Sequence, residues 1–319
     1  MSAKQKVRVA VIGAGNMGKN HLRNYFLLPE AELVGLADIN PKTKELADEY
    51  DTAFFTDYIE MLDVAKPDAV SIVVPTPFHA AVATEVMNRG IHCLLEKPIA
   101  SSVEEANALI ALAKKKGVVF TVGHIEHYNP LVTALKKLLD SGAIGEVTSV
   151  VCRRVGGFPS VEPKTDVIID LAVHGKKPER LFSHGSRTHH SKEIDSAEIL
   201  LDYGHASGFI QANWLTPVKI RTISVTGSKG YIHGNYMTQE LESYVHNMRK
   251  ESDSFSNFIV NMGEPKKDII KVDFEEPLII ELKTFVAKIR GEKAGALVGP
   301  ESARDALQYA LDAVAPYAP

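Results

Sequence analysis

Three glycines stand in a regular pattern near the N-terminus, at Gly13, Gly15 and Gly18. They follow the β-branched run Val7–Ile12, which predicts a buried strand, and they precede a helical pattern. The first glycine permits a tight turn, the second lets the backbone approach a pyrophosphate, and the third lets the helix pack closely on the strand. Because the N-terminus of a helix presents free N–H groups, this arrangement favours phosphate binding.

An acidic residue completes the glycine motif. Asp38 follows Gly18 by about 20 residues, at the end of a second predicted strand over residues 32–37. A carboxylate there accepts hydrogen bonds from the ribose hydroxyls of a dinucleotide and repels a 2′-phosphate. The sequence therefore predicts that NAD binds in preference to NADP. The alternatives are an ordinary glycine-rich turn and a methyltransferase that binds a nucleoside by a similar turn.

A lysine follows another predicted strand, over residues 92–95, in the segment Glu96-Lys97-Pro98. In open α/β sheets, ligands bind at the carboxyl ends of the strands. Lys97 at that edge can donate a hydrogen bond to a substrate hydroxyl beside the nicotinamide and stabilise negative charge on its oxygen. Pro98 restricts the loop and permits a cis peptide bond. The alternative is a solvated loop charge.

A carboxylate and an imidazole stand four residues apart, at Asp170 and His174. On a helix this spacing puts both side chains on one face. Asp170 can then orient His174 or contact the substrate, while His174 takes a proton near neutral pH. The apolar residues around the pair predict partial burial, where each group needs a partner. A buried polar pair without a chemical role is the alternative.

The remaining histidines lack a spacing typical of metal ligands. One group stands in a Gly/Ser/Lys-rich stretch and consists of His184, His189, His190 and Asp195. We interpret that stretch as a solvated loop. His124 and His127 flank Glu126, and we expect them to line a cleft between domains. The sequence therefore predicts no metal site.

The elements around these residues follow two patterns. Up to residue 123, short apolar strands alternate with helices, which predicts βαβ units and a parallel sheet. From residue 146 onward, longer alternating strands are separated by turns, which predicts a mostly antiparallel sheet. The predicted fold class is α/β, with an N-terminal Rossmann doubly wound parallel sheet and a C-terminal α+β domain built on an open antiparallel sheet. We expect residues 1–123 to bind NAD and residues 124–319 to bind substrate and form oligomers, with the last helices packing back on the first domain.

Composition narrows the class of protein further. The 319 residues suffice for about two domains. Lys and Arg number 36 against 40 Asp and Glu, and a net charge of −4 does not attract nucleic acid or an anionic membrane. Two distant cysteines, Cys93 and Cys152, indicate a reducing compartment, so we expect a cytoplasmic protein. The apolar runs are shorter than the roughly 20 residues of a membrane helix, and the N-terminus lacks a signal-peptide cleavage site.

Several short motifs, taken in order, resemble the Gfo/Idh/MocA oxidoreductases, a family named for glucose–fructose oxidoreductase and inositol dehydrogenase. The motifs are Gly13-Ala14-Gly15-Asn16-Met17-Gly18, Pro75-Thr76-Pro77-Phe78-His79, Glu96-Lys97-Pro98, Gly123-His124 and Asp170-x-x-x-His174. The resemblance implies catalytic roles for Lys97, Asp170 and His174. It also implies cofactor contacts at Gly13, Gly15, Asn16, Met17, Gly18, Asp38, Thr76, His79, Glu96 and Lys97. Members form dimers or tetramers through the open sheet, so we expect a homodimer or homotetramer.

A narrower resemblance points to the branch of the family that oxidises the 3-hydroxyl of UDP-N-acetylglucosamine or its uronate with NAD. It rests on residues 123–130, 153–156 and 213–217. It implies a sugar or nucleotide-sugar substrate held by Lys97, His124, Asn129, Arg153, Asp170, His174 and Trp214.

Two further functions stay open at the level of the sequence. The first is a dehydrogenase of a free polyol or sugar such as inositol, or a reductase of an oxo-sugar. The second is a non-catalytic NAD-binding regulatory protein. Gly175-Lys176-Lys177-Pro178 favours the second, because relatives begin an Asp-containing helix at that place.

Overall fold

The structure is a computed structural model that describes residues 5–157, 178–189, 193–252 and 258–317. Asp170, His174 and the segment that follows them lie outside the described residues. The chain divides into two compact units, which we call unit 1 and unit 2. Unit 1 comprises Met1–Tyr128 and Glu275–Gln308, and unit 2 comprises Asn129–Phe274 and Tyr309–Pro319.

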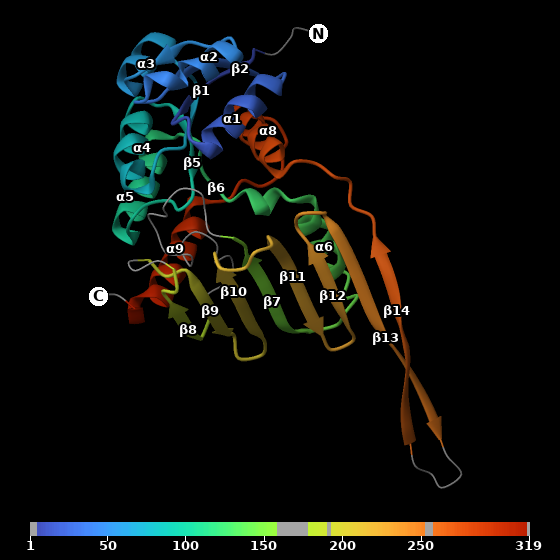
Figure 1. The fold of residues 1–319 in the computed structure, drawn as a ribbon. Helices are drawn as coiled ribbons and strands as arrows, with labels where there is room; N and C mark the ends of the chain where they lie inside the picture. The colour runs from blue at the N-terminus through green and yellow to red at the C-terminus, as the bar shows by residue number, and fades with distance from the viewer. Residues whose placement is uncertain (1–4, 158–177, 190–192, 253–257, 318–319) are drawn as a thin grey trace. The chain divides into compact units, whose positions relative to one another are not determined.

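Unit 1 is built on a parallel sheet of six described strands in the order β3-β2-β1-β4-β5-β6 (Figure 1). The strands are β1 (Val7–Ile12), β2 (Ala31–Ala37), β3 (Phe54–Phe55), β4 (Ala69–Ile72), β5 (His92–Glu96) and β6 (Phe120–Gly123). The strand order reverses between β1 and β4, and such a switch point is where doubly wound sheets bind ligands. The predicted Rossmann sheet is confirmed, although β3 was not expected.

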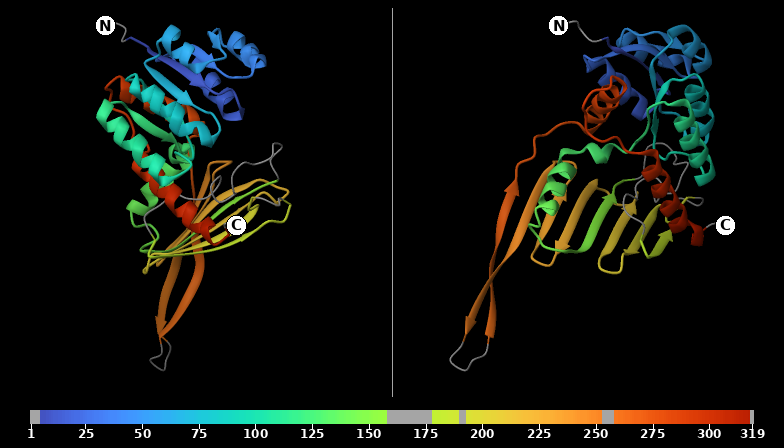
Figure 2. Two further views of the ribbon diagram at one scale, coloured as in Figure 1. Left: turned by 90° about the vertical axis from the view of Figure 1, so that its left-hand side faces the viewer. Right: turned by 180° about the vertical axis from the view of Figure 1, so that it is seen from behind.

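Helices cover both faces of this sheet (Figures 1 and 2). The helical segments of unit 1 are α1 (Asn16–Leu27), η1 (Pro41–Thr43), α2 (Lys44–Glu49), α3 (Tyr58–Ala65), η2 (Thr76–Phe78), α4 (His79–Asn88), α5 (Val103–Lys116), η3 (Ile125–Tyr128) and α8 (Pro277–Ile289). Leu22 and Tyr25 of α1 share a buried core with Leu282 and Phe285 of α8. The late helix α8 therefore completes the core of a unit that the N-terminal residues begin.

Side chains cap the starts of two helical segments of unit 1. The Asn40 side chain accepts the N–H of Lys42 at 3.2 Å. Ser102 Oγ accepts the N–H of Glu105 at 3.2 Å, and Glu105 Oε2 accepts the N–H of Ser101 at 3.0 Å. These side chains satisfy N–H groups that the first helical turn leaves without partners.

Unit 2 is built on eight described strands in the order β14-β13-β12-β11-β7-β10-β9-β8. They are β7 (Val147–Val155), β8 (Arg180–Ser186), β9 (Ser196–Asp202), β10 (Ser207–Asn213), β11 (Ile220–Gly227), β12 (Gly230–Asn235), β13 (Glu240–Ser252) and β14 (Phe258–Ile270). Among the described pairs, β7 and β10 are parallel and the rest are antiparallel. The predicted mostly antiparallel sheet is confirmed.

The strand register separates a covered face of this sheet from an open one. Helix α6 (Pro130–Asp140) places Leu131 and Leu135 against Val225 and Ile232. Helix α9 (Pro300–Val314) belongs to both units, and its C-terminal part packs beside Ile199 on the same side (Figure 2). On the open face, four apolar residues lie side by side on neighbouring strands: Phe182, Leu200, Phe209 and Val151.

The stretch that we interpreted as a solvated loop differs from that expectation. His184 lies inside β8, paired with Glu198 of β9. Asp195 is fully buried and accepts the backbone N–H groups of Thr188 at 2.9 Å and His189 at 2.6 Å. These amide bonds explain the burial of the carboxylate, because they replace the hydrogen bonds of water. His190 lies outside the described residues.

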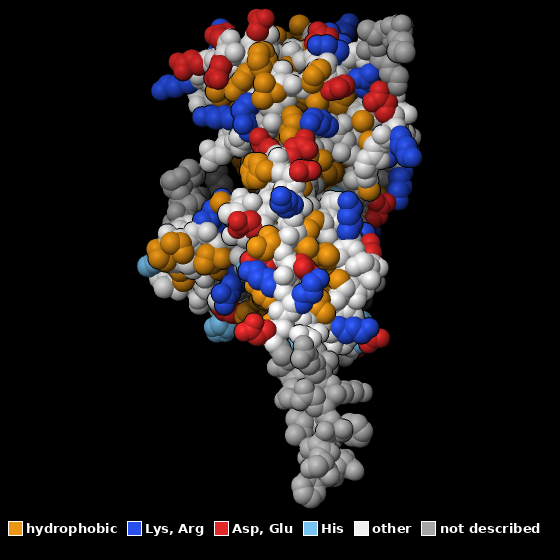
Figure 3. Space-filling view, turned by 90° about the vertical axis from the view of Figure 1, so that its right-hand side faces the viewer, with side chains coloured by type: hydrophobic (Ala, Val, Ile, Leu, Met, Phe, Trp, Pro, Cys, Tyr) orange, Lys and Arg blue, Asp and Glu red, His pale blue; other side chains and the backbone are white. Residues whose placement is uncertain are grey.

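Charges of both signs are mixed on the surface. On the face drawn in Figure 3, Lys and Arg side chains alternate with Asp and Glu side chains and form no continuous basic area. Within the described ranges, no helix is both long and apolar enough to cross a bilayer.

Candidate nucleotide site in unit 1

The turn after β1 requires glycine at two places. Gly13 has a φ of 100°, and a Cβ added to it would lie 2.6 Å from the carbonyl oxygen of Val73. A Cβ on Gly18, in the first turn of α1, would collide with the carbonyl oxygen of Gly13. A larger residue at either position would therefore clash with backbone atoms. The glycines bring β1, the end of β4 and α1 into close contact.

Gly15 differs from its two neighbours in the motif. Its backbone, with φ of −66° and ψ of −169°, is one that any residue adopts. Apart from its two chain neighbours, no atom of the described residues lies within 4 Å of the place where its Cβ would stand. Neither conformation nor internal packing explains this glycine. The space lies at the N-terminus of α1, where Asn16 and Met17 begin the helix, and a pyrophosphate fits there.

Asp38 lies just beyond β2 and joins two loops. Its Oδ2 accepts the N–H of Ala14 at 2.6 Å, and its Oδ1 accepts the N–H of Asn40 at 2.8 Å. Each carboxylate oxygen keeps a second lone pair for another donor. The carboxylate is thus held beside the glycine turn and retains the capacity to accept ribose hydroxyls.

His79 begins α4 and is enclosed by main chain. Only 1% of the residue is exposed, and its ring lies 2.8 Å from two carbonyl oxygens, with Nε2 facing Val74 and Nδ1 facing Pro98. Burial lowers the pKa of His79, and the two carbonyl oxygens act in the opposite direction. Because both ring nitrogens face the backbone, His79 connects the ends of β4 and β5. The half-buried Thr76 opens the first of these two loops.

The end of β5 places Lys97 beside a buried carboxylate. Glu96 is 6% exposed, and its Oε1 lies 3.1 Å from Nε2 of the fully buried His21. Its Oε2 accepts the backbone N–H of Lys97 at 3.2 Å. Lys97 itself is half-buried, and the Lys97–Pro98 peptide bond is cis. The Glu96 carboxylate therefore contacts the α1 helix and the backbone of its neighbour.

Unit 1 brings part of the predicted site together. The glycine turn, Asp38, Thr76 and Lys97 all follow parallel strands, so they share the carboxyl edge of one sheet. His124 follows β6 at the same edge and is half-buried.

The predicted substrate residues of unit 2 that the structure describes come from three segments. Asn129 caps α6 by accepting the N–H of Leu131 at 3.1 Å and is 2% exposed. Trp214 is 6% exposed and belongs to a hydrophobic core. Arg153 is exposed in β7, and its neighbour Arg154 lies 5.9 Å from the ring centre of Tyr236.

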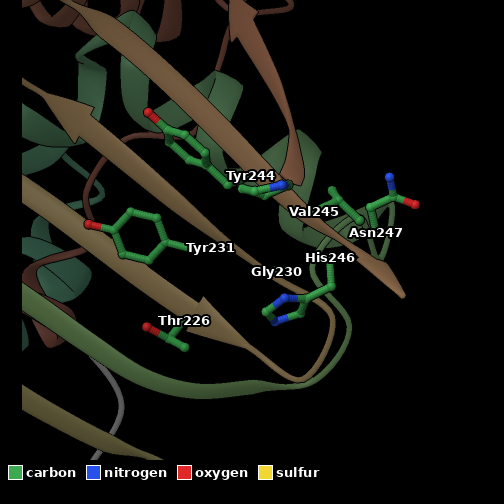
Figure 4. Close-up of a pocket in the computed structure, with 8 residues that line it drawn as sticks. Thr226, Gly230, Tyr231, Tyr244, Val245, His246 and Asn247 are labelled. Carbon is green, nitrogen blue, oxygen red and sulfur yellow. The ribbon is translucent and has the colours of Figure 1, made fainter. Parts of the chain in front are cut away.

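Unit 2 carries a separate hollow of about 350 Å³ near the hairpin of β13 and β14 (Figure 4). Tyr231 and Tyr244 line it, with ring centres 6.0 Å apart. Their hydroxyl groups donate to Ser224 and Glu242, at 2.9 and 2.7 Å. The lining contains none of the predicted site residues. In the described part of the chain, no three His, Cys, Asp or Glu side chains group as metal ligands.

We did not expect two buried polar residues of unit 1 that belong to α1 and α8, His21 and Glu281. Each is fully buried within unit 1. Glu281 had a detectable signal, because it shares the helical spacing of the apolar residues Leu278, Leu282 and Phe285. An acid within an apolar helical stripe indicates a buried carboxyl group.

Both parts of the chain match known sequence families. Residues 7–124 match the family described as "Oxidoreductase family, NAD-binding Rossmann fold", and residues 132–233 match the "GFO/IDH/MocA C-terminal domain". The chain belongs to the GFO/IDH/MocA oxidoreductase family. The resemblance stated from the short motifs is thereby confirmed.

Two curated relatives of this GFO/IDH/MocA protein have named activities. UDP-N-acetylglucosamine 3-dehydrogenase of Acidithiobacillus ferrooxidans is 36% identical over 169 residues, which is 53% of this chain and 51% of the relative. scyllo-Inositol 2-dehydrogenase (NAD(+)) of Bacillus subtilis is 32% identical over 178 residues, 54% of this chain and 52% of the relative. These matches thus span about half of the length of each relative.

Solved structures share the whole fold of this family member. UDP-N-acetylglucosamine 3-dehydrogenase GnnA from Acidithiobacillus ferrooxidans superposes with a TM-score of 0.83 at 24% identity, covering 97% of this chain and 96% of that one. GenD2 from gentamicin A biosynthesis, solved in complex with NAD, gives a TM-score of 0.80 at 21% identity, with coverages of 98% and 95%. At these identities the likeness establishes the fold.

Proposed function

We propose that this protein is an NAD-dependent dehydrogenase that oxidises a ring hydroxyl of a sugar or nucleotide sugar, with the C3 hydroxyl of UDP-N-acetylglucosamine or its uronate as the favoured substrate. The observation that carries the proposal is the open space at Gly15, at the N-terminus of α1 and in the same turn whose Ala14 N–H is bound by Asp38. A glycine with free space around it at a helix N-terminus suits a bound pyrophosphate.

The cofactor part of the proposal assigns two contacts to this chain. The N–H groups at the start of α1 hold the pyrophosphate, and Asp38 accepts the ribose hydroxyls. The negative charge of Asp38 disfavours a 2′-phosphate, so we propose NAD in preference to NADP. When bound, NAD supplies the group that accepts a hydride from the substrate carbon.

The substrate part of the proposal concerns three side chains. Lys97 donates a hydrogen bond to the substrate oxygen and stabilises its negative charge. The family resemblance assigns proton removal to His174, with Asp170 orienting the imidazole. We further propose that unit 1 binds the nucleotide, that unit 2 supplies substrate contacts, and that the open face of its sheet joins copies in a homo-oligomer.

The choice of substrate draws on the printed names of the relatives. One is a dehydrogenase of UDP-N-acetylglucosamine, and another is a dehydrogenase of scyllo-inositol. Both names describe oxidation of a polyhydroxylated ring compound. The higher identity belongs to the first, and residues 123–130 resemble the nucleotide-sugar branch.

The test is NAD reduction measured with UDP-N-acetylglucosamine, its uronate, scyllo-inositol and glucose in parallel. We expect NADH with the nucleotide sugar, and we expect K97M to bind NAD normally while turnover falls about 10²–10³-fold. NADH formed with scyllo-inositol alone would replace the substrate assignment by a polyol. NAD binding without turnover of any of these compounds would support the regulatory alternative.

A further inference from the structure

A fully buried carboxyl group lies in unit 1 and has no role in the proposed chemistry. Glu281 belongs to α8 and is 0% exposed. Neither of its carboxyl oxygens has a hydrogen-bond partner among the described residues. An ionised carboxylate without a partner is far more costly to bury than a neutral carboxylic acid. The surroundings of Glu281 therefore favour the protonated group.

The charged neighbour that acts on Glu281 is another acid. Burial raises the pKa of Glu281 well above its usual value, and the negative charge of Glu96 raises it further. Unlike Glu281, Glu96 has hydrogen-bond partners, because His21 and the N–H of Lys97 both contact its carboxyl group, at 3.1 and 3.2 Å. One proton on Glu281 removes the repulsion between the two acids.

Two phenols also lie near Glu281. Tyr25 of α1 and Tyr128 of η3 both feel its charge, and burial raises the pKa of Tyr128 to about 12. Tyr25 bonds Ser71 at 2.9 Å, and Tyr128 accepts the N–H of Val298 at 3.2 Å. Both phenols are therefore neutral near pH 7 and add no negative charge beside Glu281.

A second buried atom lacks a partner close to the same acid pair. His21 lies on α1, which packs against α8, and its Nδ1 is buried and unpartnered among the described residues. When Nε2 carries the hydrogen that faces Glu96, Nδ1 is a hydrogen-bond acceptor. A neutral carboxylic acid supplies one O–H donor, and one buried water molecule can connect such a donor to an acceptor that it does not contact directly.

We propose that Glu281 is a positioning residue: it is held as a neutral carboxylic acid and is joined to His21 through a buried water molecule, which holds Glu96 against His21 and the backbone N–H of Lys97 at the end of β5. The contacts of Glu96 with His21 and with the backbone N–H of Lys97 measure 3.1 and 3.2 Å. The protonation of Glu281 does not depend on the proposed dehydrogenase activity. The part of the proposal that concerns turnover through Lys97 rests on the proposed function.

Infrared spectroscopy tests the protonation directly. We expect the difference spectrum between the wild type and E281Q near pH 7 to contain the C=O stretch of a protonated carboxylic acid. The exposed Glu45 provides the matched control, so E45Q should leave that band in place. A difference spectrum that shows the loss of a carboxylate band would overturn the proposal.

The pH dependence of the unfolding temperature is a second test of whether Glu281 is protonated. A carboxyl group whose folded pKa is raised binds more protons in the folded state, so its stabilising effect is complete below the unfolded pKa of about 4.3 and declines as pH rises. E281Q carries no such group. We expect E281Q to gain Tm relative to the wild type between pH 5 and 8, and an identical pH dependence of both proteins would overturn the proposal.

Turnover tests the positioning role. E281L removes both hydrogen-bonding atoms, and we expect kcat to fall about 10–100-fold with unchanged NAD affinity, because small misplacements of catalytic groups have effects of this size. E281Q keeps a hydrogen-bond donor and should recover most of the loss. Wild-type kcat in E281L would overturn the positioning role. If the wild type turns over none of the candidate sugars, the proposed function fails, while the infrared and unfolding results still decide the protonation.

Discussion

The Nδ1 atom of His79 lies 2.8 Å from the carbonyl oxygen of Pro98, so the first residue of α4 is bound to the loop that carries Lys97. The opposite ring nitrogen lies 2.8 Å from the carbonyl oxygen of Val74. One imidazole thus joins the loops after two neighbouring strands. The family resemblance places His79 among the cofactor contacts. The structure adds that this side chain links two loops.

Replacing His79 by alanine should destabilise the protein by about 1–3 kcal/mol, because a buried carbonyl group loses the N–H of the neutral imidazole as its hydrogen-bond donor. The folded-state pKa of His79 is lowered, so the stability from its neutral form is present above the unfolded pKa of about 6.5 and is lost as pH falls below it. The loss in H79A should therefore be larger at pH 8 than at pH 5. Chemical denaturation at both pH values measures it, with the exposed His205 as the control variant H205A. An equal loss at both pH values would contradict this reasoning.

The three glycines of the first turn should respond differently to alanine. G15A meets open space and should keep the wild-type Tm, yet its new methyl group should weaken NAD binding at least about tenfold, or about 1.4 kcal/mol. G18A meets the backbone of Gly13 and should lose about 1–3 kcal/mol of stability. Calorimetric NAD titration and thermal unfolding separate the two effects. Normal NAD affinity in G15A would remove the pyrophosphate from this place.

Substitution of Asp38 should change cofactor choice. D38S removes the charge that repels a 2′-phosphate, so we expect the ratio of NAD to NADP affinity to fall by at least about tenfold. Fluorescence titrations with both reduced cofactors measure this ratio. D48S alters an exposed carboxylate of α2 and serves as the control. A ratio that stays constant in D38S would show that Asp38 acts only as a link between loops.

Two substitutions of Asn129 distinguish helix capping from substrate binding. N129A should lose about 1 kcal/mol of stability, whereas N129S should keep most of it because serine also caps helices. If Asn129 acts as a cap alone, the KM of the substrate should be equal in both variants and the wild type. A raised KM in N129S, with retained stability, would instead support the substrate contact that the resemblance implies.

Steric constraints of the backbone made the glycine turn predictable. A Cβ at Gly18 would meet the backbone of Gly13, and a Cβ at Gly13 would meet the backbone of Val73 after β4, and such constraints leave their mark on residue type. The same holds for the caps at Asn40 and Ser102, where a side chain bonds an amide two or three residues onward. The matching families then confirm the Rossmann domain.

The edge strand β8 was harder to predict. We did not expect β8, because its sequence RLFSHGS mixes glycine and polar residues and reads as a turn-rich segment. Hydrogen bonding to β9 makes it a strand, and this partner contributes more than the intrinsic preference of the residues. For the same reason His184 lies in a sheet and not in a solvated loop.

The sequence by itself determined the family, the parallel and antiparallel halves, and the glycine turn after β1, because each depends on short-range spacing. Tertiary structure decided which polar groups are buried. Glu96, His21 and Glu281 come together from β5, α1 and α8, and only packing between segments far apart in the chain removes them from water. Burial then raises the pKa of Glu281, since the cost of a buried charge depends on neighbours that no local pattern specifies.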